Sequence, residues 1–534
     1  MSSIAPTTTK SRLVPYLVIL AAGLVAHGLS LRAQFYMDDF MHIVGHTRVT
    51  EGEGLFSWRR LLPYLAYYSM TKVGLHSATA FHALNLAIHL VLSVVVFAAM
   101  RDFDRFLGAG KKFGPFSMPL LVALIFAGHP LASEPVNYAR CTPMLLVGLF
   151  SFVAAWLTLR WFFVPKQRGL ISVLIVLPIA GATISKEPGL IHALGSVAMV
   201  AWFCRGKVAR VDTDSNKRGL GLFPVVFAEG LLLLAIPAIF LIGKAGTALA
   251  QPQFMDHALT HCRVFWMYVQ RMVLPIDLSV DHYIQWTVSW SDLFAVLGLV
   301  GIVMVLGGAL WLGKRAPLFA MAVVLGAFPL LMRMGYVIGH EMMVEYRTYP
   351  SLPWVAVLLA GALSRMATKV KPQLVTICTT AFLLFLVSLS LSKSTLWSKP
   401  DALARDALRQ YPDNNRARAA LMRQLLIAKR YDLMTEEYLA AKTSISKMVE
   451  HNRSNDNMRV YDHDRLFGDW AFVETAYAPG LVATSGAEVA KKHIDRTIEV
   501  LKGEGEKIQE GDPLKSLVDF RERLEDFREE EASE

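Results

Sequence analysis

The chain has 534 residues, of which 54% are hydrophobic and 18% are charged, and its formal net charge at pH 7 is +10. Its mean hydropathy of +0.39 excludes a single soluble enzyme and a disordered chain. Four cysteines in this length also exclude a secreted module held together by disulfides. The composition therefore predicts a membrane protein.

Eleven apolar runs are predicted to form transmembrane helices. A hydrocarbon core needs a helix of about 20 apolar residues, and the shorter runs reach this length only with flanking residues. The runs lie at 13–31, 79–100, 117–129, 143–164, 170–184, 188–204, 220–243, 292–312, 317–332, 351–364 and 373–391. The sequence thus predicts an all-α, polytopic membrane helix bundle over residues 13–392, with about eleven spans.

Basic residues gather on one side of these predicted spans. They include Lys10, Arg101, Lys166, Arg205 and Lys314, and the positive-inside rule places such loops in the cytoplasm. The N-terminus at 1–12 is then cytoplasmic. The outer-face segments are 32–78, 130–142, 244–291, 333–350 and the C-terminal tail at 393–534.

Two outer segments mix basic, aromatic and apolar residues. They lie at 59–72 and 261–275, and both are too short and too charged to cross the bilayer. We expect amphipathic helices at headgroup level. A buried connecting helix is the alternative for each.

The tail is predicted to form a soluble helical domain. Apolar residues recur at helical spacing from Leu403 to Leu426 and are interrupted by a turn at 412–414. This helix, turn and helix resembles one tetratricopeptide repeat. Further helices are expected near 465–477, 485–503 and 513–530. A peptide-binding groove and a helical cap on the membrane domain both stay open.

Ionisable residues at the outer ends of the spans are the candidate site, because charge at a membrane edge is costly. Asp38 and Asp39 follow the first span, with His42 three residues further on. Adjacent carboxylates repel each other, so holding both requires a cation, a basic partner or a raised pKa in one of them. A solvated helix N-cap is the alternative.

Two further outer turns carry both signs of charge. His129, Glu134 and Arg140 follow the third span, where prolines are expected to stop one helix and start another. Lys186 and Glu187 follow the fifth span. A structural ion pair is the alternative for these last two.

The outer loop at 333–350 is rich in methionine and contains two glycines. It ends with Glu345 and Arg347 at the start of a predicted helix. Helix N-terminal amides and a guanidinium both bind anions, so this loop is a candidate phosphate or pyrophosphate site. An outer loop anchored by a snorkelling Arg347 is the alternative.

Five stretches together resemble the multispanning glycosyltransferases of the GT-C class, in the branch with C-terminal tetratricopeptide repeats, which includes proteins that resemble protein O-mannosyltransferases. They are 36–39 (YMDD), 81–89 (FHALNLAIH), 127–140 (AGHPLASEPVNYAR), 274–281 (LPIDLSVD) and 345–351 (EYRTYPS). The resemblance implies that a sugar moves, with inversion, from a polyprenyl-phosphate donor to a protein or envelope-glycan acceptor at the outer face of the lipid bilayer.

This resemblance also implies roles for the charged residues. Asp38 or Asp39, with Asp39 preferred, acts as the base for the acceptor hydroxyl. The lipid phosphate is assigned to Arg347, Arg140, His129 and Lys186, because several donors spread its developing charge. Residues that orient these groups are Glu134, Glu187, His42 and Glu345.

No nucleotide cofactor is expected, because the sequence has no Walker motif and no dinucleotide-binding glycine pattern. No nucleic acid partner is expected either. A divalent cation, Mg²⁺ or Mn²⁺, held by Asp38 and Asp39 stays open. By analogy, short outer loops and a single repeat favour a bacterial inner membrane, with the site and the tail in the periplasm.

Other functions also stay open. One is a transferase that acts on a lipid or an envelope glycan. Another is a transporter or flippase for a polyprenyl-linked sugar, which should place charges near the bilayer midplane and show repeated halves. The charges here gather at the outer ends of the predicted spans instead, which favours the transferase.

Overall fold

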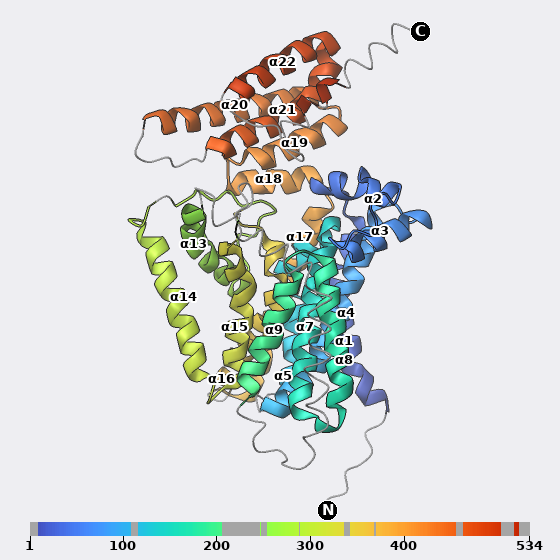
Figure 1. Cartoon of the computed structure of the whole chain (residues 1–534), viewed down its shortest axis with the longest axis vertical. Helices are drawn as coiled ribbons and strands as arrows, with labels where there is room; N and C mark the ends of the chain where they lie inside the picture. The colour runs from blue at the N-terminus through green and yellow to red at the C-terminus, as the bar shows by residue number, and fades with distance from the viewer. Residues whose placement is uncertain are drawn as a thin grey trace, which may run out of the picture.

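The computed structural model describes residues 9–107, 116–205, 246, 254–287, 289–335, 342–367, 370–454, 463–503, 517–518 and 520–522. The regular elements of these residues are helices. Paired extended backbone occurs there as an isolated antiparallel bridge between His282 and Met343. Figure 1 shows a long helix bundle with the C-terminal helices stacked on one end. The predicted all-α class is therefore confirmed.

Seven described helices are long and apolar enough to cross a membrane, or eight if one bent pair counts as a span. Their main helical segments are α1 (Thr9–His27), α4 (Ala78–Leu107), α7 (Thr142–Phe163), α8 (Arg168–Ser185), α14 (Leu293–Leu312), α15 (Pro317–Leu331) and α17 (Pro372–Trp397). The chain is thus a multispanning helical bundle.

The predicted count of eleven spans is not confirmed. α9 (Gly189–Cys204) and α16 (Leu352–Ala367) fall on two predicted runs, but each has only 16 residues. Such a helix is about 24 Å long, which is less than the hydrocarbon thickness of about 30 Å. The predicted run at 220–243 lies outside the described residues.

The third predicted span is a broken helix. α5 (Met118–Ala127) is followed by η3 (Pro130–Ala132) and α6 (Ser133–Asn137), and the chain bends by 49° at the break. Prolines lack an N–H and clash with the preceding turn, so they stop one helix and start the next, as expected from the sequence. The bend leaves residues 128–139 buried in the bundle.

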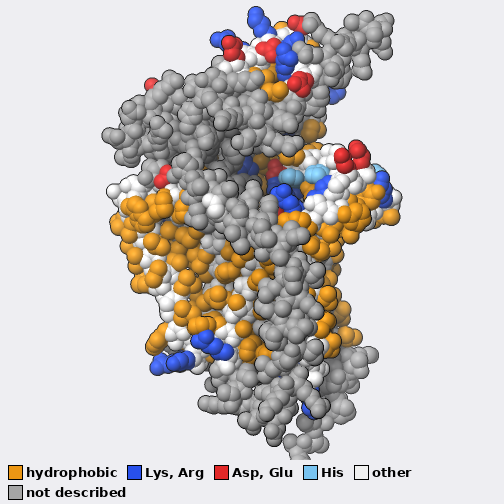
Figure 2. Space-filling view, viewed as in Figure 1, with side chains coloured by type: hydrophobic (Ala, Val, Ile, Leu, Met, Phe, Trp, Pro, Cys, Tyr) orange, Lys and Arg blue, Asp and Glu red, His pale blue; other side chains and the backbone are white. Residues whose placement is uncertain are grey.

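One apolar core extends from the bundle into the tail. It includes Ile125 and Leu145 of the bundle together with Leu403 and Ala420 of the tail, so the first tail helices pack on the membrane domain. In Figure 2 hydrophobic side chains cover a broad part of the bundle surface. Lys314 and Arg315, just after α14, are exposed at the end opposite the tail.

The elements at the ends of the spans and between them are short, apart from α13 (Phe254–Val273). They include η1 (Gly28–Arg32), η2 (Phe40–Val44), α2 (Thr47–Thr50), α3 (Leu61–Lys72), η4 (Ala139–Cys141) and η8 (Glu345–Ser351). α13 continues further toward its N-terminus than the predicted interfacial helix. Most of its side chains are buried or half-buried, as in the alternative of a buried connecting helix.

The tail contains α18 (Pro400–Gln410), α19 (Asn415–Ile427), α20 (Tyr431–Ser454), α21 (His463–Ser485) and α22 (Ala487–Gly503). Asn414 caps α19, because its side chain accepts a hydrogen bond from the Ala417 N–H. The predicted helix, turn and helix is therefore present. The helices expected at 465–477 and 485–503 correspond to α21 and α22, and most of 513–530 lies outside the described residues.

Candidate active site

A strained turn after η1 places the two aspartates. Met37 has φ of 41°, a left-handed conformation that is costly for a residue other than glycine. The Asp39 carboxylate accepts hydrogen bonds from the Tyr36 N–H at 3.0 Å and the Arg140 N–H at 2.8 Å. Asp39 is fully buried, and burial raises its pKa to about 7 although these amides act in the opposite direction.

Asp38 forms an ion pair with the Arg140 guanidinium, whereas Asp39 contacts the Arg140 backbone. The Asp38 N–H donates to the Tyr138 hydroxyl at 3.1 Å. The Asp38 side chain is 30% exposed and that of Arg140 is 19% exposed. The adjacent carboxylates thus combine two of the expected solutions, a basic partner for Asp38 and a raised pKa for Asp39.

Beside this turn, cations gather around one aromatic ring. Arg60, Arg140, Lys186 and Tyr346 line a cavity of about 20 Å³, enough for one water molecule. Lys186 Nζ lies 5.2 Å and Arg347 Cζ 5.8 Å from the centre of the Tyr346 ring. Burial, together with the charges of Arg60, Arg140 and Arg347, lowers the pKa of Lys186 to about 7.

Glu187 balances part of this positive charge. Its carboxylate lies 3.3 Å from Arg60 Nε and 3.8 Å from Arg59 Nε, so its partners come from the start of α3. Burial alone would raise the pKa of Glu187, but the Arg60 charge lowers it overall. The ion pair thereby fixes Arg60 beside Lys186.

The two other predicted glutamates fix the position of η8 (Glu345–Ser351), called the Arg347 segment below. Glu134 Oε2 accepts a hydrogen bond from the Tyr346 N–H at 2.7 Å. Glu345 Oε1 accepts one from the Ser279 N–H at 2.7 Å and another from His282 Nε2 at 3.0 Å. Both carboxylates are buried, so they position Arg347 through its neighbours in sequence.

The two predicted histidines contact backbone groups and another histidine. His129 Nε2 bonds the Met272 carbonyl at 3.0 Å, and its Nδ1 accepts from the Leu131 N–H at 3.2 Å. Both ring nitrogens of this buried residue thus contact backbone groups. His42 lies on η2 and stacks on His46, with 6.4 Å between ring centres.

The aspartates do not fit a divalent-cation site. Such an ion takes oxygen ligands, but Asp38 faces a guanidinium and both Asp39 oxygens face amide N–H donors, whose positive ends repel a cation. In the part of the chain that the structure describes, no group of three His, Cys, Asp or Glu side chains is arranged to hold a metal ion.

Arg60 and Tyr138 are site residues without a sequence-based assignment. Arg60 reaches Glu187 from 127 positions away, and Tyr138 binds the backbone of Asp38 across 100 positions. One signal for Arg60 was present, because Arg59 and Arg60 form a basic pair at the start of an aromatic helix in an outer segment.

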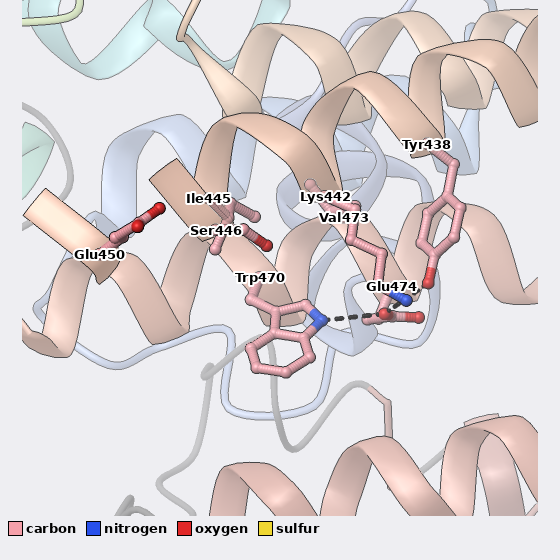
Figure 3. Close-up of a pocket in the computed structure, with 8 residues that line it drawn as sticks. All are labelled: Tyr438, Lys442, Ile445, Ser446, Glu450, Trp470, Val473 and Glu474. Carbon is pink, nitrogen blue, oxygen red and sulfur yellow. Dashed lines mark hydrogen bonds between the residues drawn. The ribbon is translucent and has the colours of Figure 1, made fainter. Parts of the chain in front are cut away.

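A second cavity, of about 440 Å³, lies in the tail between α20 and α21. Figure 3 shows side chains of both helices around it. The buried Glu474 accepts hydrogen bonds from the Tyr438 hydroxyl and the Trp470 indole, both at 2.9 Å, and His493 Nε2 lies 2.8 Å away. The volume suits a small ligand, but this carboxylate is already engaged by its neighbours.

A scan against protein-family models returns no match for this chain, and a search of curated proteins returns no significantly similar sequence.

Proposed function

We propose that the protein is a membrane glycosyltransferase, which moves a sugar from a polyprenyl-phosphate donor to a protein or another outer-face acceptor with inversion. The main support is the juxtaposition of the Asp38–Arg140 pair with a cation cluster at one end of an apolar bundle. A lipid-linked substrate needs its phosphate bound at such a membrane edge, while its hydrocarbon chain stays in the bilayer.

The cation cluster is the proposed site for the donor phosphate. Arg60, Arg140, Lys186 and Arg347 are buried or half-buried there, where charges interact more strongly than in water. An arriving phosphate would favour the protonated form of Lys186, whose pKa is lowered to about 7. Fixed cations at the leaving oxygen then stabilise the charge that develops during transfer.

Asp38, and not Asp39 as the sequence analysis preferred, is our proposed base. A general base must reach the proton it removes, and Asp38 is partly exposed whereas both oxygens of the buried Asp39 accept backbone hydrogen bonds. In the reaction the acceptor oxygen attacks the anomeric carbon and gives its proton to Asp38. The bond from that carbon to the phosphate oxygen breaks, and polyprenyl phosphate leaves with the electron pair. Asp39 holds the turn in place.

The proposal also covers the orientation of the protein in the membrane and the side on which its site lies. The exposed basic residues at the end opposite the tail, such as Lys314 and Arg315, favour a cytoplasmic position for that end. The site and the repeat-like tail then face the periplasm of a bacterial inner membrane. The tail, which packs against the site end of the bundle, would help to hold the acceptor.

The test is intact-mass analysis of envelope proteins and glycolipids. Cells carry the wild-type protein, the Asp38→Asn variant, or neither. We expect a mass of hexose or pentose size that is present only with the wild-type protein, and the molecule that carries it names the acceptor. If no mass changes while a lipid-linked sugar accumulates on one leaflet, the protein is a transporter and the transferase proposal is wrong.

A further inference from the structure

The tail contacts the site through a short outer segment, residues 274–287, called the contact loop below. Lys393 Nζ and Gln410 Nε2 both donate to the Leu278 carbonyl. Asn414 Nδ2 donates to the Asp281 carbonyl at 3.1 Å. The C-terminal end of α17 and the start of the tail therefore hold this loop by its backbone.

His282 of the contact loop connects the tail to the Arg347 segment. Its Nδ1 lies 2.9 Å from the Tyr411 hydroxyl, and its Nε2 lies 3.0 Å from Glu345 Oε1. His282 is buried, and its backbone pairs with Met343. The loop thus joins the segment that carries the site by both main chain and side chain.

Hydrogen-bond chemistry fixes the direction of the bond between His282 and Glu345. A carboxylate only accepts, so Nε2 of His282 must donate to Glu345. Nδ1 shares a hydrogen bond with the Tyr411 hydroxyl at 2.9 Å, and either group can supply the hydrogen. Tyr411, His282 and Glu345 therefore form a continuous chain of donors and acceptors from the tail to η8.

The next two residues of η8 belong to the cation cluster. Tyr346 is held by Glu134 through its N–H, and its ring lies against Lys186 and Arg347. Glu345, Tyr346 and Arg347 are consecutive residues of the same short helix, so the contacts of Glu345 constrain the backbone that carries this ring and the guanidinium.

We propose that His282 is a positioning residue. It couples the packing of the tail, whose Tyr411 contacts His282, to the affinity of η8 and its Arg347 for the donor phosphate. The phosphate in this statement rests on the proposed function. The coupling between Tyr411, His282 and Glu345 does not, since it is a property of the chain itself.

The experiment uses the full chain in detergent and farnesyl phosphate as the probe. Tyr411→Phe removes the hydroxyl that shares a hydrogen bond with His282 Nδ1. Tyr283→Phe is the matched control, because the Tyr283 hydroxyl also contacts the tail, at Met448, but it is not part of the chain to Glu345. We expect the Kd for farnesyl phosphate to rise about tenfold in Tyr411→Phe, as for loss of one hydrogen bond, and to stay unchanged in Tyr283→Phe.

A conservative variant separates positioning from folding. His282→Gln keeps an amide N–H that can donate to Glu345, whereas His282→Ala keeps neither contact. We expect the donor KM to rise most in His282→Ala and less in His282→Gln, with kcat unchanged in both. Equal KM values for wild type, His282→Ala and His282→Gln would overturn the proposal.

Amide hydrogen exchange gives a readout that needs no ligand. Exchange over residues 345–351 should accelerate in Tyr411→Phe and His282→Ala but not in Tyr283→Phe. Exchange equal to wild type in all three variants overturns the coupling. If the wild-type protein neither binds farnesyl phosphate nor transfers sugar, the proposed function fails, and accelerated exchange would still support the coupling.

Discussion

The two ends of the helix bundle hold their charges in opposite ways. At the tail end Asp39, Glu134 and Arg347 are buried and interact with backbone amides or an aromatic ring. At the other end Lys314 and Arg315 are exposed. Both ends are polar in sequence. Buried carboxylates and buried cations bear a desolvation cost together at the tail end, whereas at the other end the buried Arg168 donates to the carbonyls of Trp161 and Phe162.

This difference separates the charges that orient the protein in the membrane from the charges of the candidate site. Exposed charges of one sign orient a membrane protein and need no precise partners. Buried charges of both signs persist only where hydrogen bonds compensate them, and such sites are functional candidates. Changes to the charges of the site at the tail end should therefore affect activity strongly, and changes to exposed charges at the other end should not.

The largest effect is expected from Asp38→Asn. Loss of a general base lowers kcat by about 10²–10⁴-fold, and the half-exposed position should leave the fold intact. The measurement is single-turnover transfer from a synthetic polyprenyl-phosphate sugar. Glu53→Gln is the control, because Glu53 is an exposed acid in the same outer segment. A kcat for Asp38→Asn equal to that of Glu53→Gln would rule out Asp38 as the base.

Arg347→Ala should come next, with a loss of about 10²-fold in kcat/KM for the donor. The guanidinium contributes to the cation cluster beside Tyr346, so use of the donor should suffer more than use of the acceptor. Titrating each substrate separately measures this difference. An equal loss for both substrates would indicate that Arg347 supports the fold and not the phosphate.

A smaller effect, on the pH dependence of stability, is expected from Asp39→Asn. The folded pKa of Asp39 is raised to about 7 from 3.8, so between these values the folded state binds one more proton than the unfolded state. Stability through this group is greatest at low pH and falls as pH rises, by about 1 kcal/mol per pH unit between pH 4 and pH 7. In the Asp39→Asn variant the free energy of unfolding, measured by thermal unfolding in detergent, should not show this decrease with pH.

The opposite sign holds for Lys186, and it acts in another pH window. Its folded pKa is lowered to about 7 from 10.5, so stability through Lys186 rises as pH increases from about 7 to 10.5. Measurements below pH 6.5 therefore report on Asp39 without Lys186. If wild type and Asp39→Asn have parallel slopes there, the raised pKa of Asp39 is wrong.

Hydropathy predicted the long helices well because membrane spans are local features of the sequence. α4, α7, α14 and α17 all coincide with predicted runs. The length of α9 and α16 was less predictable, since a short apolar run can be a span or a buried helix. The proline break after α5 was read correctly, because its cause lies in the covalent structure of proline.

The candidate site was predicted as residue types but not as contacts. That Arg140 binds both aspartates, through its backbone and its side chain, depends on packing between segments 100 residues apart. The same holds for Arg60 with Glu187 and for His282 with Tyr411. No local pattern encodes such pairs, so the sequence predicted that these charges lie at the ends of helices without naming their partners.

The smallest effect is expected from the double change Lys314→Gln and Arg315→Gln. Both side chains are exposed at the end opposite the site, and exposed substitutions usually change stability by less than about 0.5 kcal/mol. In detergent, kcat and the donor KM should therefore stay within about twofold of wild type. Because orientation depends on basic loops, the double variant should instead lower the fraction of correctly inserted protein, measured by protease protection of the tail in vesicles. A large loss of kcat in detergent would show that the exposed end takes part in the chemistry, and the division between the two ends would then fail.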